Sequence, residues 1–217
     1  TLELSGPSPF ASGSGTANLG SSSFVVAAGA LAGQHMVIVG GSNSPMVYDP
    51  TGDSFAPGPV LPNVVSFGSH SFVTPDGNAI VVTGGGTGGL MLFDAGAGTF
   101  ANSIAMPSNV GNGAHTTRLS SGPGSGDYLI VVGNNAPDII FYDHSGPNAS
   151  TGPNLSAAAG SGASTLYLSA GPEAGKYLIV HGSSTTGSTI FDPLTITTAP
   201  GPSLPGSVNN SSIIPLN

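Results

Sequence analysis

The sequence contains no cysteine and no tryptophan, and only Arg118 and Lys176 are basic among its 217 residues. Without cysteine there are no disulfides, thiolate zinc sites, iron–sulfur clusters or cysteine nucleophiles. Two basic residues against ten acidic ones give a net charge of −8, so the chain cannot neutralise a nucleic-acid backbone. It also lacks the Lys/Arg clusters that hold proteins to anionic lipid, and no apolar run approaches the roughly 18 residues of a membrane-spanning helix. We therefore expect no nucleic-acid partner and no membrane insertion.

The chain is instead rich in turn-forming residues, with 35 glycines and 19 prolines. Such a content can indicate disorder, but disorder usually pairs few hydrophobic residues with many charges. Here 38% of the residues are hydrophobic and 6% are charged, so a core can form. The length suits one all-β domain spanning residues 1–217.

Several features favour secretion to the outside of the cell. The sequence begins at Thr1 without a methionine, as a processed chain would, although a trimmed fragment would look the same. Four sequons are candidate glycosylation sites, at Asn148, Asn154, Asn209 and Asn210. We predict a secreted or surface-exposed glycoprotein.

An aromatic–aspartate pair recurs four times, at intervals of 45, 49 and 49 residues. The pairs are Tyr48-Asp49, Phe93-Asp94, Tyr142-Asp143 and Phe191-Asp192. An apolar run ending in small residues precedes each pair, a short strand-like segment precedes each run, and a Pro-rich stretch follows. Each repeat therefore predicts four short strands, which is typical of a β-propeller blade.

We predict an all-β fold, a β-propeller of four-stranded blades at about 12–62, 63–107, 108–155 and 156–205. Residues 1–10 and 206–217 each resemble a spare strand. Three arrangements follow: four blades close a small ring whose seam the spare strands complete, the chain is part of a larger propeller, or a spare strand pairs with another subunit. We expect the closed ring of four.

The repeat resembles the kelch family over residues 12–205. Kelch blades carry a Gly-Gly doublet after the second strand and an aromatic residue six positions after the aspartate. Gly40-Gly41 and Gly84-Gly85 match the doublet, and Phe55 and Phe100 match the aromatic position. In the last two repeats the doublet becomes Gly133-Asn134 and His181-Gly182, and Ala149 and Thr198 replace the aromatic residue.

Two other motifs have structural explanations. The four repeated aspartates stand at strand ends, where an Asp side chain caps the following turn. Residues 84–89 satisfy the Gly-x-Gly-x-x-Gly pattern, but a strand-like segment follows where a dinucleotide site needs a helix. We expect turn caps and a hairpin.

The candidate site consists of four equivalent positions before the first strand of each repeat: Ser22, His70, His115 and Ser164. The first strand of a blade lies nearest the propeller axis, so these side chains converge and could bind a ligand. His70 and His115 could share a transition metal. The alternative is that short polar residues here bond the loop backbone.

Residues 70–85 also resemble a blade segment of galactose oxidase and glyoxal oxidase, in which a ligand His precedes a strand, a Pro-Asp-Gly turn and a second strand ending in Gly-Gly. That resemblance implies a copper-radical oxidase. Two departures oppose this activity: Ser69 stands where the family has a Tyr, and there is no cysteine for the radical cofactor.

We predict a non-catalytic recognition or structural module without a cofactor, binding a neutral glycan or another protein subunit. The lack of tryptophan removes the best stacking platform for sugars. The alternatives are a copper-dependent oxidase of the galactose oxidase type, and a subunit of an extracellular filament or coat that self-assembles through its terminal strands.

Overall fold

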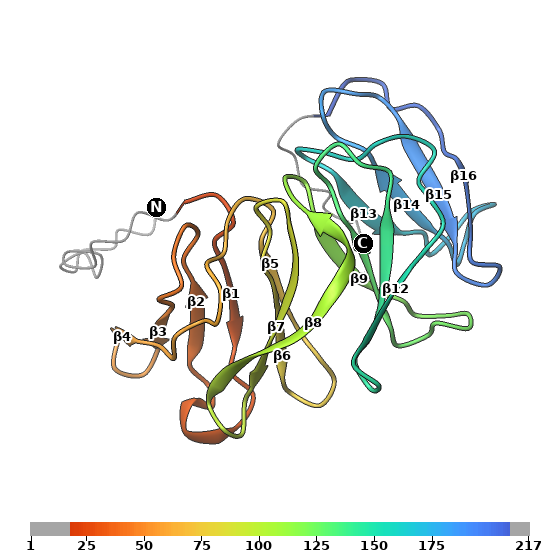
Figure 1. The fold of residues 1–217 in the computed structure, drawn as a ribbon. Coiled ribbons are helices and arrows are strands. Elements are labelled where there is room, and N and C mark those ends of the chain that lie inside the picture. Colours follow the sequence, from red (N-terminus) through yellow and green to blue (C-terminus); the bar gives the residue numbers. More distant parts are fainter. Residues whose placement is uncertain (1–17, 209–217) are drawn as a thin grey trace, which may run out of the picture.

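The computed structural model describes residues 18–208, which form four antiparallel four-stranded sheets (Figure 1). We call each sheet a blade. The first comprises β1 (Ser22–Val25), β2 (His35–Ile38), β3 (Met46–Asp49) and β4 (Ser54–Pro57). The second comprises β5 (His70–Val73), β6 (Ala79–Val82), β7 (Thr87–Asp94) and β8 (Thr99–Val110). The third comprises β9 (His115–Arg118), β10 (Tyr128–Val131), β11 (Ile139–Asp143) and β12 (Asn148–Thr151). The fourth comprises β13 (Ser164–Tyr167), β14 (Tyr177–Val180), β15 (Ser188–Asp192) and β16 (Thr197–Pro200).

The only helix within residues 18–208 is a single 3₁₀ turn at Gly29–Leu31. No helix in this part of the chain is long and apolar enough to cross a membrane.

The blades stand side by side, with the first and the fourth at opposite ends of the row (Figure 1). Within each blade the strands follow chain order, so that every strand pairs with its sequence neighbour. The first strands lie beside one another across the gaps between blades, β1 with β5 and β9 with β13. The all-β fold with propeller-like blades is therefore confirmed.

The hydrophobic core consists of three clusters, one between each pair of successive blades. The second strands of the two central blades supply residues to the clusters on both sides because side chains alternate along a strand. In β6, Ala79 and Val81 belong to the cluster shared with the first blade, whereas Ile80 and Val82 belong to the cluster shared with the third. All four side chains are at most 1% exposed, so each central blade depends on both neighbours.

The aromatic–aspartate spacing follows from strand pairing. The residue six positions after each aspartate lies directly across from the aromatic residue of the pair. The rings of Tyr48 and Phe55 are 4.9 Å apart, and those of Phe93 and Phe100 are 4.8 Å apart. In the third and fourth blades Ala149 and Thr198 occupy the partner position without a ring.

The four repeated aspartates cap turns, as predicted. In each case a side-chain oxygen accepts a hydrogen bond from a backbone N–H two or three residues later. The N···O distances are 2.8 Å for Asp49, 2.9 Å for Asp94, 2.8 Å for Asp143 and 2.9 Å for Asp192. Residues 84–89 likewise belong to the predicted hairpin, because β7 begins at Thr87 and pairs with β6.

The glycines after the second strands fill a backbone requirement. In the second blade, Gly84, Gly85 and Gly86 all have φ between 66° and 76°, a left-handed conformation that costs other residues energy. The corresponding residues of the fourth blade are Gly182, Ser183 and Ser184, with φ of 69°, 52° and 59°. In the fourth blade the doublet position therefore begins at Gly182. The sequence comparison had begun it one residue earlier, at His181.

Closure of a ring by these four blades is not detected in residues 18–208. The predicted spare strand at 1–10 and most of that at 206–217 lie outside the described residues. Val208, the last of the described residues, forms a β-bridge with Thr185, as Ala159 of the fourth blade's leading loop does with Ala136. The segment after the fourth blade therefore begins with the same β-bridge as the segment after the third blade.

We predict that Ser184→Gly stabilises the fold, because Ser184 holds a left-handed φ of 59° with an exposed side chain. The free energy of unfolding should rise by about 1 kcal/mol, measured by urea denaturation. Ser54→Gly, in the exposed strand β4, is the matched control and should lower stability. A Ser184→Gly variant less stable than the wild type would contradict this account of the loop.

Candidate functional site

Ser22, His70, His115 and Ser164 occupy the first position of the first strand in each blade. The loops before Ser22, His70 and His115 pass very close to the next blade. A Cβ atom on Gly68 would overlap the carbonyl of Gly111, and one on Gly113 would overlap the carbonyl of Gly160. The glycines therefore let the backbones of neighbouring blades approach around the candidate residues.

Each histidine joins its own blade to the next. His70 Nδ1 lies 3.0 Å from the Gly68 carbonyl oxygen, and its Nε2 lies 2.6 Å from Thr116 Oγ1. Because a carbonyl can only accept, Nδ1 carries the proton of the neutral ring, and Nε2 accepts from the Thr116 hydroxyl. His115 repeats the arrangement with Gly113 at 3.0 Å and Thr165 at 2.7 Å. We call each His–Thr pair an inter-blade latch.

Burial keeps both imidazoles neutral. Desolvation lowers the pKa of His70 to about 4, with a smaller opposing effect from the Gly68 carbonyl and a further lowering by His115. Burial also lowers the pKa of His115. Protonation of Nε2 would destroy the acceptor of the latch. The latch therefore contributes fully above the ordinary histidine pKa of 6.5, and its contribution falls as the pH drops toward 4.

A copper site of the oxidase type does not fit these residues as they stand. Metal binding needs the Nε2 lone pair, which already accepts from a threonine hydroxyl in both latches. Within residues 18–208 no group of three or more His, Cys, Asp or Glu side chains could hold a metal ion. The bond from each histidine to its loop carbonyl is the backbone contact that was the alternative to metal binding, but the Ser22 and Ser164 hydroxyls make no such bond.

Ser22 and Ser164 hold the same position without a latch, because serine is too short to reach the next blade. Their hydroxyls are buried without a hydrogen-bond partner. The same is true of Ser71, which stands in the first-strand position that Thr116 holds in the third blade. No latch therefore joins the first blade to the second, and ligand binding at the four positions stays a prediction.

The predicted glycosylation sites are only partly described. The side chains of Asn148, in β12, and Asn154 are exposed. Asn209 and Asn210 lie outside the described residues. Glycosylation at all four stays a prediction.

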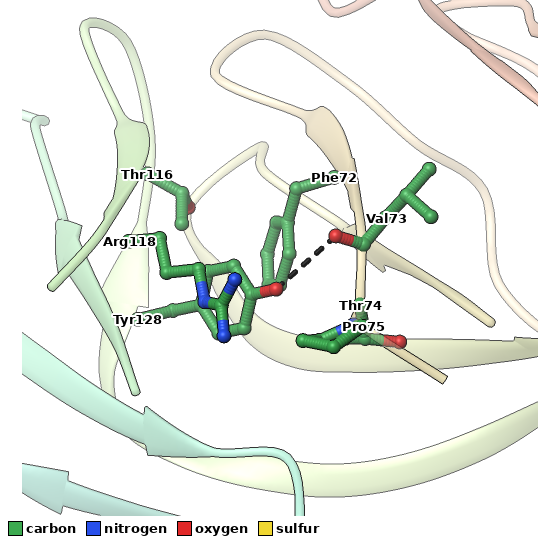
Figure 2. Close-up of a pocket in the computed structure, with 7 residues that line it drawn as sticks. All are labelled: Phe72, Val73, Thr74, Pro75, Thr116, Arg118 and Tyr128. Atoms are coloured by element: carbon green, nitrogen blue, oxygen red, sulfur yellow. Dashed lines mark hydrogen bonds between the residues drawn. The ribbon is translucent and has the colours of Figure 1, made fainter. Parts of the chain in front are cut away.

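A pocket that the sequence analysis missed lies between the second and third blades. It has a volume of about 320 Å³ and is lined by Phe72, Val73, Thr74, Pro75, Thr116, Arg118 and Tyr128. Figure 2 shows Arg118 and Tyr128 on one side and Val73, Thr74 and Pro75 on the other. The Phe72 and Tyr128 rings are 4.4 Å apart, and the Tyr128 hydroxyl donates to the Val73 carbonyl at 3.1 Å. Burial raises the pKa of Tyr128.

The repeat contains the signal for this pocket. The fourth position of the first strand holds Val25, Val73, Arg118 and Tyr167 in the successive blades. Arg118 is therefore a charged residue at a position that is otherwise apolar or aromatic. Aligning the four first strands would have singled it out.

No protein-family model matches the sequence, and no curated protein matches it. Solved structures do match the fold. One is the hydrazine synthase of Kuenenia stuttgartiensis, at 14% identity and a TM-score of 0.59, covering 86% of this chain and 55% of that one. Another is a fungal alcohol oxidase of the AA5 family in complex with copper, at 15% identity and a TM-score of 0.60, covering 82% of this chain and 43% of that one.

These similarities confirm the propeller-like fold, including its likeness to galactose oxidase-type oxidases. The chain spans about half the length of the structures it matches. At these identities the likeness concerns the fold alone.

We predict that Ser22→His installs a third latch. The new Nδ1–H would face the Gly20 carbonyl, as in the other latches, and Nε2 would accept from the unpaired Ser71 hydroxyl. The free energy of unfolding should rise by about 1 kcal/mol, measured by urea denaturation. Ser164→His is the control, because no described blade follows the fourth, and it should give no gain. Equal gains from both variants would contradict the latch.

Proposed function

We propose that the protein is a secreted, non-catalytic structural module that associates head-to-tail with further copies of itself through the two end faces of its row of blades. The observation that carries this proposal is that both end faces have the composition of the buried faces between blades. We call the face toward the next blade the forward face and the opposite one the backward face.

The forward face of the fourth blade carries a continuous apolar row. Leu166, Leu178 and Ile190 lie directly across from one another on β13, β14 and β15. The matching row of the second blade, Phe72, Ile80 and Leu92, is part of the cluster shared with the third blade. The residues of the fourth-blade row belong to none of the three clusters, and Leu166 and Leu178 are only half-buried.

The backward face of the first blade is mainly apolar, with Ser23 and His35 as polar residues on it. Val25, Val37, Met46, Tyr48 and Phe55 point away from the second blade, since the alternate residues of these strands fill the first cluster.

The backward face of the first blade is more exposed than the backward faces of the other three blades at the position of the repeated aromatic residue. The residues that correspond to Tyr48 are Phe93, Tyr142 and Phe191, which are at most 2% exposed. Tyr48 is half-buried, and its cross-strand partner Phe55 is 37% exposed. Tyr48 is thus more exposed than the residues that correspond to it in the other three blades.

A second copy of the chain is the partner that these faces fit. Each interface inside the molecule joins the forward face of one blade to the backward face of the next. The two end faces are therefore the two halves of the same type of interface, and one copy offers each half to another copy. Such a head-to-tail contact closes into a ring or continues as a filament.

The non-catalytic part of the proposal rests on the latched histidines and on the absence of a metal-binding cluster within residues 18–208. Self-assembly through the terminal strands, most of which lie outside the described residues, stays a prediction. Glycan binding stays a prediction.

Complementary variants test the proposal. Analytical ultracentrifugation of the wild type should show a mass that rises with protein concentration up to about 100 μM, in the range of ordinary protein association. Leu178→Asp places a charge on the forward end face only, and Val37→Asp places one on the backward end face only. Association would bury this unpaired charge, so the altered face should no longer bind its partner. Each variant alone should remain a monomer, whereas an equimolar mixture should form one-to-one dimers through the intact faces.

The control is Leu194→Asp, in an exposed turn residue that belongs to neither end face. It should assemble like the wild type, and circular dichroism should show that all variants fold. A wild type that stays monomeric throughout, or a Leu178→Asp variant that assembles normally, would overturn the proposal.

A further inference from the structure

Arg118 is the sole arginine of the chain and has no carboxylate partner within residues 18–208. The other basic residue, Lys176, pairs with Glu173 at 2.8 Å and Asp192 at 3.5 Å. Among the described residues, the one hydrogen bond of the Arg118 side chain joins its Nε to the Gly126 carbonyl at 3.4 Å. Both terminal nitrogens of the guanidinium therefore keep their N–H groups unused.

Arg118 lines two pockets at once. One is the 320 Å³ pocket against Phe72, Pro75 and Tyr128 (Figure 2). The other has a volume of about 520 Å³ and is lined by Arg118, Leu119, Ser120, Ser125 and Gly126. A ligand in the first pocket would have Val73, Thr74 and Pro75 on one side and Tyr128 with the guanidinium on the other (Figure 2).

The remaining polar groups of the first pocket are already engaged. The Tyr128 hydroxyl donates to the Val73 carbonyl. The Thr116 hydroxyl donates to His70 in the latch, and the Thr74 hydroxyl bonds Asp76 and the Asn78 carbonyl. The guanidinium belongs to an exposed residue and is the only unused hydrogen-bond donor among the described side chains that line this pocket, so a ligand with an acceptor could bond it in place of water.

We propose that this pocket binds a small ligand that carries a single carboxylate on one ring. A carboxylate matches the two parallel N–H groups of a guanidinium. A volume of about 320 Å³ lies at the lower end of the range of small-molecule sites, which suits a ligand of one ring against Phe72 and Pro75. This inference is independent of the assembly through the end faces.

Charge favours a monocarboxylate over phosphate. The chain carries a net charge of −8, so the overall field repels anions and repels a dianion twice as strongly. Asp76, whose pKa is lowered by hydrogen bonds from Thr74 and Asn78, is ionised and close enough to influence Tyr128. Binding therefore relies on contact with one guanidinium rather than on long-range attraction, and salt that screens the repulsion should not weaken it steeply.

Nuclear magnetic resonance titration of the ¹⁵N-labelled protein tests the proposal with two acids, D-glucuronate and benzoate, and their neutral analogues, D-glucose and benzamide. We expect at least one acid to shift the amide resonances of residues 72–75 and 116–118 saturably, with a dissociation constant of about 1 mM. The neutral analogues should shift none of them. Whichever acid binds more tightly shows whether the ring is sugar-like or apolar.

Substitutions of Arg118 distinguish the effect of guanidinium geometry on ligand binding from the effect of its positive charge alone. Arg118→Gln should abolish the shifts, and Arg118→Lys, which keeps the charge but loses the paired N–H geometry, should weaken binding by about tenfold. Lys176→Gln removes the other cation and should leave binding unchanged. The proposal is overturned if neither acid binds, if the neutral analogues bind equally well, if phosphate binds more tightly than the acids, or if Arg118→Gln binds like the wild type.

Discussion

The structure depends on one constraint: the second strand of each blade is apolar on both faces, so a blade needs a neighbour on either side. In β6 and β10 every side chain is buried, and alternate residues enter opposite clusters. Burying one such side chain stabilises the fold by roughly 1.5–3 kcal/mol. A face without a neighbouring blade lacks this stabilisation for a whole row of side chains. The side-by-side order of the blades follows from this constraint, and so does the association that we propose for the two end faces.

Close packing of sheets also explains the loops. Where neighbouring blades meet, the backbone of one passes so near the next that a Cβ at Gly68 or Gly113 would overlap a carbonyl. After each second strand the chain reverses through left-handed residues such as Gly84 and Gly182. The high glycine content therefore serves the contacts between blades. The His–Thr latches add polar links at the same places, and burial keeps neutral the two histidines that a sequence pattern alone could assign to a metal.

Much of the fold was predictable because it is local and repeated. The intervals between aromatic–aspartate pairs gave the number of blades, and the aspartate caps followed from ordinary turn chemistry. The latches were not predictable, because the partner of His70 is Thr116 in the next blade, and that pairing depends on how two sheets are placed. The walls of the Arg118 pocket also come from two blades, so its shape was not predictable, although an alignment of the four first strands points to Arg118 itself. Closure was expected on the assumption that four blades complete a ring, which no local signal could decide.

Hydrogen exchange of the native protein tests the central constraint most directly. Strands β6 and β10 are covered on both faces, whereas β14 has a described neighbour on one face only. At low protein concentration the amides of residues 177–180 should exchange at least about tenfold faster than those of residues 79–82 and 128–131, because local opening exposes them without global unfolding. Raising the concentration should slow exchange in β14 and leave β6 and β10 unchanged. Equal rates in all three strands, independent of concentration, would contradict the account.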